Sequence, residues 1–475
     1  MPKIRILLLT NRDSDNVGDQ IIEATAISIL KGVMKNLGIP ASGYAISSRA
    51  AGIISKKYMK TRDPELLAPA RDAISNADLI VFGGAPLFNY AYQNFYLRTI
   101  KTLELAEEYG VPVLFSSIGV EPYSETNAKS QELKKALALP CVRQITTRDD
   151  FESLQKYVEG TDTPVAHVSD PAVLADIVFR KKPAAPAGPQ PGTPSRKARL
   201  KRIAKRLLGR PVTAPAPSAP AAGRPAAATS AVASVESKRK TIGLVVTRAG
   251  IFADNGIRFS EADQRRFWLE TRDLLTSRGY DVRFFTTGHF SDEVFLDTLV
   301  KSQGIPAKQA AVTVNSPEEL INQLRACDGV IAYRLHASIT SYALDIPSVG
   351  LSWNFKVPYF YESVGHGDRA LAPEAWTATE VVDAVEKAMA EGVTKDEAFL
   401  TTVYDTLFDG IKNVFAPESD RTPYSYAELR DKLPRYGGTS RAQYEEKVRR
   451  KLRRTYESYQ KYSTYYLEAK RREAA

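Results

Sequence analysis

An arginine and a histidine stand together in Arg334-Leu335-His336, where the apolar run 330–333 gives way to a helical pattern. Arginine binds carboxylates and phosphates through paired, charge-assisted hydrogen bonds. Histidine has an ordinary pKa near neutral pH, so it can deliver or accept a proton there. This triplet therefore indicates an anion-binding site with acid–base chemistry. The alternative is a histidine that only caps a helix or bonds the backbone.

Other candidate ligand-binding residues also follow strand-like segments directly. Glycine lets the backbone approach a ligand closely, and a helix start offers N–H groups and a positive dipole end to an anion. These candidates are Asn16, Gly18, Asp19, Gly83, Gly84, Gly119, Arg148, His289 and Lys356. Each has an ordinary structural alternative when taken singly. The alternatives are a helix-terminal charge, a tight turn, an ion pair of Arg148 with a neighbouring aspartate, and the first residue of a helix.

The segments that must position these residues alternate between strand and helix. Continuous apolar strand-like runs separated by helical patterns indicate parallel sheets that are covered on both faces. Two such series, at 1–178 and 241–420, predict an α/β protein of two Rossmann-like domains that face a cleft. Ligands in such sheets bind beyond the carboxyl ends of the strands. The residues that follow each strand are therefore the best site candidates.

Composition and length are those of a globular protein. The 475 residues, 43% of them hydrophobic, are enough for two or three domains with sizeable cores. No window of about 18 apolar residues is free of charges, so we predict no transmembrane helix. The apolar run at 4–10 lacks a following cleavage site, so we interpret it as a first strand and expect a cytoplasmic protein. No His, Cys, Asp or Glu group has metal-ligand spacing, so we expect no metal.

Residues 179–240 predict a disordered linker between the two domains. From Lys181 to Lys240 there are fourteen Lys or Arg and one acid, a balance of +13, which leaves −3 for the rest of the +10 chain. Pro, Ala and Ser dominate the remainder of the segment, which cannot build a core. The part 196–210 has apolar residues at helical spacing on a basic background, as in helices that bind anionic membranes. Docking on the parent protein is the alternative. We expect no nucleic acid, because no recognition motif accompanies the charge.

Residues 421–475 predict a Tyr-rich helical tail. An apolar stripe recurs there at steps of three and four residues, at Tyr444, Val448, Leu452, Tyr456 and Tyr459. Such a stripe is more often a packing surface than a cofactor site. We therefore expect the tail to lie against another surface or a partner subunit, while its basic residues also suit membrane contact.

Taken together and in this order, the segments resemble the polysaccharide pyruvyl transferase family. The resemblance spans about 5–178 and 241–390. Its elements are Asn16 to Asp19, the glycine turn at 83–84, the run 117–120, Arg148-Asp149, Asp170-Pro171, Arg334 to His336, and Lys356. The sequence departs from the family pattern at Ala85, where a third glycine is usual, and at 86–90, where an acidic residue is common. These departures leave the acceptor sugar open.

The resemblance implies a GT-B-like fold and a ketal-forming reaction. The family transfers a carboxyethylidene group from phosphoenolpyruvate to a sugar, here of a cell-envelope polysaccharide or its lipid-linked precursor. Phosphoenolpyruvate is a substrate, and no cofactor is expected. An enzyme acting on a lipid-linked acceptor would be cytoplasmic and peripheral on the inner face of the membrane.

The resemblance also assigns roles to the candidate residues. It implies catalysis by His336, Arg148 and Lys356, and donor binding by Arg334, Leu335 and Asn354. The remaining candidates would line the cleft: Asn16, Gly18, Asp19, Gly83, Gly84, Gly119 and His289. The donor carries a carboxylate and a phosphate, which arginine and lysine bind, and its methylene carbon must accept a proton, which histidine can supply.

Two other functions remain open at the level of the sequence. A GT-B-type glycosyltransferase would hold a nucleotide sugar and usually needs an acidic residue for the ribose, for which Glu362 is the nearby candidate. A catalytically silent interaction protein tethered to the membrane is the third possibility, and the altered turn at Ala85 is its support.

Deleting 196–210 tests the membrane hypothesis for the linker. The shortened chain should keep its melting temperature, because a linker carries no core. It should stop co-sedimenting with phosphatidylglycerol vesicles, since each Lys or Arg near an anionic surface contributes about 1 kcal/mol. The intact protein should pellet at low salt and be released at high salt, because salt screens this attraction. Equal pelleting of both chains would reduce the segment to a tether.

Overall fold

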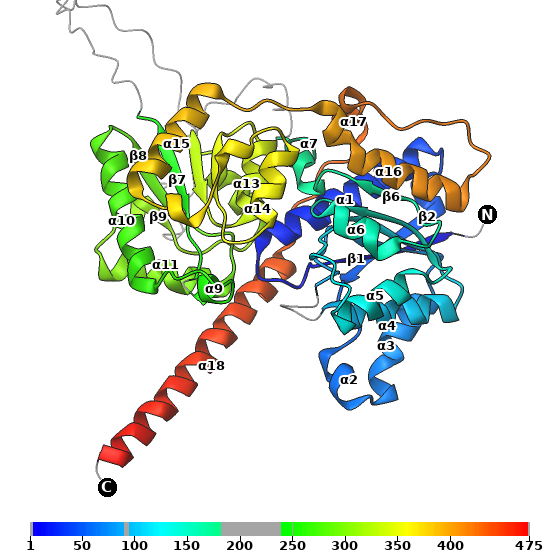
Figure 1. Ribbon diagram of the computed structural model, residues 1–475, viewed down its shortest axis with the longest axis horizontal. Coiled ribbons are helices and arrows are strands. Elements are labelled where there is room, and N and C mark those ends of the chain that lie inside the picture. Colours follow the sequence, from blue (N-terminus) through cyan, green and yellow to red (C-terminus); the bar gives the residue numbers. More distant parts are fainter. Residues whose placement is uncertain (1–2, 90–94, 182–238, 249, 474–475) are drawn as a thin grey trace, which may run out of the picture. The chain divides into compact units, whose positions relative to one another are not determined.

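Two six-stranded parallel sheets form the framework of the protein (Figure 1). The computed structural model describes residues 3–89, 95–181, 239–248 and 250–473, so the predicted segment 196–210 lies outside the described residues. The strand order is β2-β1-β3-β4-β5-β6 in the first sheet and β12-β11-β10-β7-β8-β9 in the second. The predicted α/β class with two Rossmann-like sheets is confirmed.

The first sheet and its helices come from the N-terminal part of the chain. Its strands are β1 (Ile4–Thr10), β2 (Tyr44–Ala50), β3 (Leu79–Gly83), β4 (Val113–Ile118), β5 (Val142–Thr147) and β6 (Val165–His167). The helices are α1 (Val17–Asn36), α2 (Lys56–Thr61), α3 (Ala68–Ser75), α4 (Phe95–Glu108), α5 (Ala128–Leu137), α6 (Phe151–Val158) and α7 (Ala175–Val178).

The second sheet repeats the alternation. Its strands are β7 (Thr241–Val245), β8 (Asp281–Phe285), β9 (Ala310–Ala311), β10 (Gly329–Ala332), β11 (Ser348–Leu351) and β12 (Ala370–Leu371). The helices are α9 (Gly250–Ala253), α10 (Glu261–Ser277), α11 (Phe290–Ser302), α12 (Pro317–Leu324), α13 (Leu335–Ala343), α14 (Lys356–Ser363) and α15 (Ala378–Glu391). The last helices are α16 (Glu397–Phe415), α17 (Tyr426–Lys432) and α18 (Arg441–Glu473).

The first strand shows why its residues form a sheet buried on both faces. Successive side chains of a strand point to opposite faces. Ile6 and Leu8 accordingly join the core cluster that contains α1, while Leu7 and Leu9 join the cluster beneath α3 to α5. All four are at most 2% exposed. A continuous apolar run is therefore required at β1, as the sequence has it.

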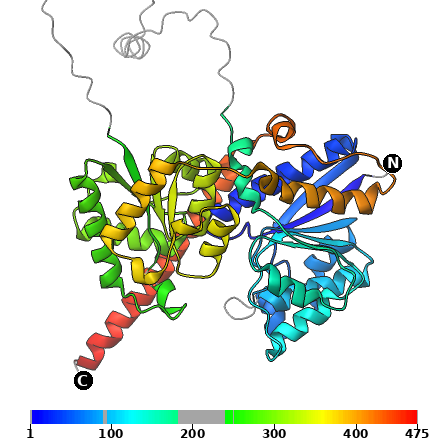
Figure 2. The same cartoon turned by 45° about the horizontal axis from the view of Figure 1, so that its top comes forward.

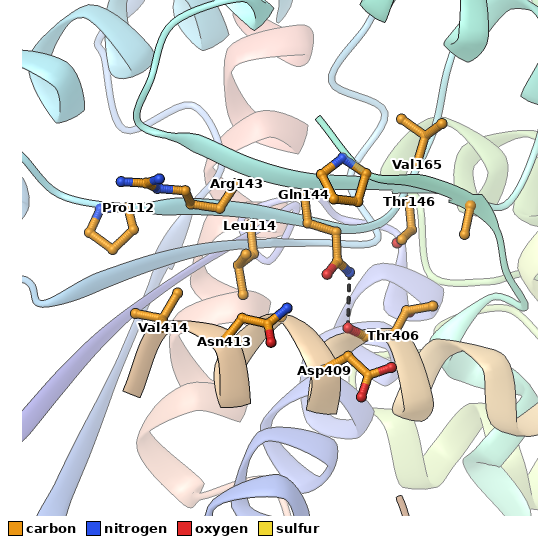
Figure 3. A pocket seen from close by; sticks show the side chains of 13 residues that line it. Pro112, Leu114, Arg143, Gln144, Thr146, Val165, Thr406, Asp409, Asn413 and Val414 are labelled. Carbon is orange, nitrogen blue, oxygen red and sulfur yellow. Dashed lines mark hydrogen bonds between the residues drawn. The ribbon is translucent and has the colours of Figure 1, made fainter. Parts of the chain in front are cut away.

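Helix α16 covers the first sheet, although it lies within the predicted 241–420 domain. It packs against α1, β4 and β5. The Gln144 side chain donates from Nε2 to the carbonyl of Thr406, at 2.9 Å (Figure 3). Gly410 permits this close approach, because a Cβ there would lie 2.8 Å from Gln144 Oε1. The chain thus returns to the N-terminal sheet at α16, after the second sheet is complete.

The predicted helical tail is confirmed as α17 and α18, and Figure 2 shows α18 as one unbroken helix. Within the described residues, no helix combines the length and apolar character needed to cross a bilayer.

Candidate active site

A cavity of about 240 Å³ lies where strand ends of both sheets meet. Nine of the predicted site residues line it: Asn16, Asp19, Arg148, His289, Arg334, Leu335, His336, Asn354 and Lys356. They come from the N-terminal end of α1, the end of β5, the start of α11, and the segments that follow β10 and β11. The fold therefore brings residues up to 340 positions apart in the sequence to one place, near the carboxyl ends of the strands.

Asn16 fixes the orientation and the tautomer of His336. Its Oδ1 accepts the N–H of Gly18 at 3.0 Å and caps α1. The amide nitrogen must then face the ring, and it donates to His336 Nδ1 at 2.9 Å. Because Nδ1 accepts this bond, a neutral His336 carries its proton on Nε2. Nε2 is buried and has no hydrogen-bond partner, so a donor group is left without an acceptor beside the cavity.

His336 is a neutral imidazole at neutral pH. Burial lowers its pKa to about 3, and Arg148, Lys356 and Arg334 act in the same direction. The nearest carboxylate, Asp19, lies 3.9 Å from Nε2. Burial raises the pKa of Asp19 as well, against the hydrogen bonds it receives from neighbouring side chains. A proton on the ring therefore requires additional negative charge in the cavity.

Arg334 is held by a buried carboxylate. Its Nε and Nη2 donate to the two oxygens of Asp292, at 2.7 and 2.8 Å. Asp292 also accepts the N–H of Arg248 at 2.9 Å and is fully buried. Burial alone would raise the pKa of Asp292, but Arg334 outweighs this effect and the pKa is lowered. Asp292 thus fixes the guanidinium in one orientation at the cavity wall.

Arg148 is buried and is not the surface ion pair considered from the sequence. Its Nη1 forms an ion pair with Asp170, and its Nε lies 3.7 Å from Asp149. Both carboxylate oxygens of Asp149 lack hydrogen-bond partners, and burial raises the pKa of Asp149 to about 6. The N-cap of α6 is the next residue, Asp150, whose side chain accepts the N–H of Ser153.

Lys356 begins a helix and also lines the cavity, so it is both the first residue of a helix and a candidate site residue. It is the first residue of α14, and its N–H donates to Asn354 Oδ1 at 3.1 Å. Burial lowers the pKa of its ammonium, whereas Asp149 raises it. The opposing charge of Asp149 therefore supports a cationic lysine at the wall.

The four predicted glycines do not line the cavity but let its walls come together. A Cβ on Gly18 would lie 2.2 Å from His336 Cβ, and one on Gly119 would lie 3.3 Å from Asp149 Oδ2. Gly83 packs beneath Leu8 and Ala26, and Gly84 adopts a φ of +61° beneath Ile22. These glycines act through packing and turn geometry.

The start of α1 is not an open anion site. The N–H of Val17 donates to the carbonyl of Thr287 at 2.7 Å, and that of Gly18 to Asn16 Oδ1. The N–H of Asp19 bonds the carbonyl of Asn16 at 3.2 Å. Protein acceptors thus satisfy the first N–H groups, and the expectation of an anion at this helix end is not supported.

Several lining residues escaped the sequence analysis: Asn11, Ser14, Pro86, Arg248, Ile251 and Trp353. Asn11 and Arg248 follow β1 and β7 closely, so a search of all residues that follow strands could have found them. Trp353 directly precedes the predicted Asn354, and its Nε1 donates to the carbonyl of Tyr333 at 2.6 Å. Its ring is thereby fixed beside the cavity.

The predicted residue His289 also lines the cavity, and its Nδ1 lies 3.8 Å from Asp292 Oδ1.

A larger cavity, of about 650 Å³, lies between the first sheet and α16 (Figure 3). Pro112, Leu114, Gln144 and Val165 line its sheet side. It shares no lining residue with the smaller cavity and contains no histidine or lysine. Acid–base chemistry on an anion is therefore assigned to the smaller cavity. Among the residues that the structure describes, no group of three or more His, Cys, Asp or Glu could hold a metal ion.

Comparison with known proteins shows the family to which the chain belongs. The profile described as polysaccharide pyruvyl transferase matches residues 16–354, which include all the predicted lining residues except Lys356. Among curated proteins, none matches the chain.

Solved structures with a similar fold include enzymes of sugar metabolism. A candidate UDP-N-acetylglucosamine 2-epimerase from Listeria monocytogenes is 10% identical, with 89% of this chain and 99% of that chain covered and a TM-score of 0.51. The UDP-GlcNAc 2-epimerase from Methanocaldococcus jannaschii is 12% identical, with 85% and 98% covered and a TM-score of 0.46. The ADP-heptose heptosyltransferase II of E. coli is 13% identical, with 82% and 99% covered and a TM-score of 0.38. At these identities the likeness concerns the fold alone.

The Asp292–Arg334 pair predicts a pH-dependent contribution to stability. Asp292→Asn should cost about 3 kcal/mol of unfolding free energy at pH 7, because it leaves Arg334 without its buried counter-charge. The lowered pKa of Asp292 means that the pair stabilises the fold above the unfolded pKa of about 3.9. The difference from wild type should shrink as the pH falls below that value.

Urea unfolding at pH 7 and near pH 3.5 measures both effects. Asp297→Asn is the matched control, because Asp297 pairs with Lys301 on the exposed face of the same helix. This control should cost at most about 0.5 kcal/mol. Equal losses for the two variants at pH 7 would contradict the buried-pair interpretation.

Proposed function

Because the chain belongs to the polysaccharide pyruvyl transferase family, and is therefore a transferase, we propose that it moves the carboxyethylidene group of phosphoenolpyruvate onto a sugar of a cell-envelope glycan. The observation that carries this proposal is the Nε2 of His336, buried and unpartnered at a cavity lined by cations. The acceptor is a polysaccharide or its lipid-linked precursor. Contact of 196–210 with an anionic membrane remains a prediction.

The charges of the cavity suit a small polyanion. Arg148, Arg248, Arg334 and Lys356 line it, against the single lining carboxylate of Asp19. Phosphoenolpyruvate carries a carboxylate and a phosphate, to which guanidinium and ammonium groups donate charge-assisted hydrogen bonds. The volume of about 240 Å³ is below the range usual for drug-sized ligands, which also favours a small donor.

Donor binding would activate His336 as an acid. The pKa of about 3 results first from burial and then from surrounding cations. A bound donor adds negative charge within the same cavity, which raises the pKa of the ring. The imidazolium then gives its Nε2 proton to the methylene carbon, and C2 becomes oxocarbenium-like. The adjacent cations stabilise the departing phosphate electrostatically.

Two acceptor hydroxyls complete the ketal. The first attacks C2 and loses its proton to a base, for which Asp19 is the lining carboxylate. The bond from C2 to the phosphate oxygen then breaks, and the second hydroxyl adds to the resulting cation and loses its proton. One hydroxyl proton replaces the proton that His336 supplied to the methylene carbon. The other leaves with the phosphate, so atoms and charge balance.

The other two functions receive less support. A nucleotide-sugar glycosyltransferase needs a larger donor site, and Glu362 does not line the cavity. A catalytically silent protein was suggested by Ala85, but Ala85 is fully buried, and its carbonyl accepts the N–H of Gly119 at 3.0 Å. The alanine in the altered turn is thus accommodated in the protein interior. The charged residues predicted for the site line the neighbouring cavity.

Phosphoenolpyruvate should raise the melting temperature of the protein, because a ligand that binds only the folded state stabilises it by mass action. A ligand at 100 times its Kd adds about 2.7 kcal/mol. Arg334→Ala should lose this shift, whereas Arg266→Ala, at an exposed position on α10, should keep it. An unchanged wild-type melting temperature at millimolar phosphoenolpyruvate would contradict the proposal.

His336→Ala should separate chemistry from binding. We expect turnover, measured as released phosphate with a lipid-linked glycan acceptor, to fall by about 10²–10⁴. The thermal shift by phosphoenolpyruvate should persist, because the cations remain. His366→Ala is the control, since that histidine does not line the cavity. Unchanged turnover in folded His336→Ala would assign the histidine a structural role only.

A further inference from the structure

From Lys451 onward, helix α18 contacts the body of the protein through cations. Lys451 Nζ donates to Glu293 Oε1 at 2.6 Å, to Asn315 Oδ1 at 2.8 Å and to the carbonyl of Val314 at 3.0 Å. Arg454 forms an ion pair with Asp15. The docking face of the helix is therefore polar.

Four large apolar side chains of α18 are instead exposed. Leu452 is 64% exposed, Tyr456 60%, Tyr459 69% and Leu467 52%. We call these four residues the outer stripe. The sequence predicts that the tail lies against another surface or a partner subunit, and within the described residues the outer stripe is exposed.

The two faces lie on roughly opposite sides of the helix. Each residue of an α-helix turns by about 100°. The outer stripe then spans about 80°, and its centre lies about 20° from Leu452, whereas Lys451 and Arg454 lie about 120° and 180° from that centre. A surface helix ordinarily buries its apolar face and exposes its polar one. Helix α18 does the reverse, and so leaves an apolar strip of large side chains for a partner outside this chain.

Charge decides which partner suits this strip. From Arg449 to Arg472 the helix carries nine Lys or Arg and two Glu, a balance of +7. A second copy would bring the same positive charge against it, which disfavours pairing of the two helices. An anionic surface would be attracted instead, and tyrosine suits such a surface because its ring is apolar and its hydroxyl prefers water.

We propose that the outer stripe of α18 lies in the interface of an anionic lipid membrane. The apolar and aromatic side chains enter the headgroup boundary while neighbouring arginines contact lipid phosphates, as in other basic amphipathic helices. This anchor is separate from the segment 196–210 and independent of the catalytic proposal. One weak anchor binds marginally, and two together hold a protein on a membrane.

Vesicle co-sedimentation of the full-length chain tests the proposal. Tyr456→Glu together with Tyr459→Glu should lower partitioning onto phosphatidylglycerol vesicles at least about tenfold, because each substitution places a negative charge at the interface. Tyr465→Glu is the matched control. Tyr465 is also exposed, at 54%, but lies about 160° from the centre of the stripe, so its substitution should have a much smaller effect.

Additional measurements distinguish the lipid surface from a second copy. All variants keep 196–210 and should melt as the wild type does, since the substituted positions are exposed. Phosphatidylcholine vesicles should bind the wild type weakly, and Arg453→Gln with Arg471→Gln should lower binding to the anionic vesicles. Unchanged partitioning of the tyrosine double variant would overturn the proposal. So would a wild-type dimer, detected by light scattering, that this double variant dissociates without any loss of vesicle binding.

Discussion

The hydrogen bond from Asn16 to His336 is the interaction on which the candidate site depends. It joins the start of α1, beneath the first sheet, to the start of α13, beside the second, with a separation of 2.9 Å. Gly18 permits this approach, because any side chain there would collide with the histidine. The neighbouring bond from Val17 to Thr287 fixes the same helix end against the loop after β8. Residues from both halves are thereby held at one cavity.

Buried charge is the second constraint. The guanidiniums of Arg148 and Arg334 are each paired with a carboxylate, Asp170 and Asp292, behind the cavity. This arrangement keeps cations at the wall without leaving them uncompensated in the interior, where an unpaired charge is costly. Burial, together with the same cations, keeps the pKa of His336 far below its ordinary value. The charges that stabilise the fold therefore also influence the protonation state of this histidine.

Much of the fold and part of the site could be predicted from the sequence, since parallel strands appear as apolar runs and their carboxyl ends meet at one edge. His336, Arg334 and Lys356, which that rule selects, line one cavity in the structure. It could not identify Asp292, which lies within the first turn of a helix and acts through a partner 42 residues away. It also could not place Gly83 and Gly84, because glycines that face a ligand and glycines that permit packing share one sequence pattern. The amphipathic pattern of α16 shows that one of its faces is buried, but not which sheet covers that face.

The return of α16 has a consequence for how this protein can be divided. A fragment that ends after α7 would lack the helix that covers one face of β4 and β5, and Leu114, fully buried in the whole chain, would lose part of its cover. A fragment that begins at β7 would carry α16 without the sheet on which it packs. The two sheets are therefore not interchangeable modules. A chimaera that exchanges the N-terminal sheet with that of a relative would have to exchange 397–415 as well.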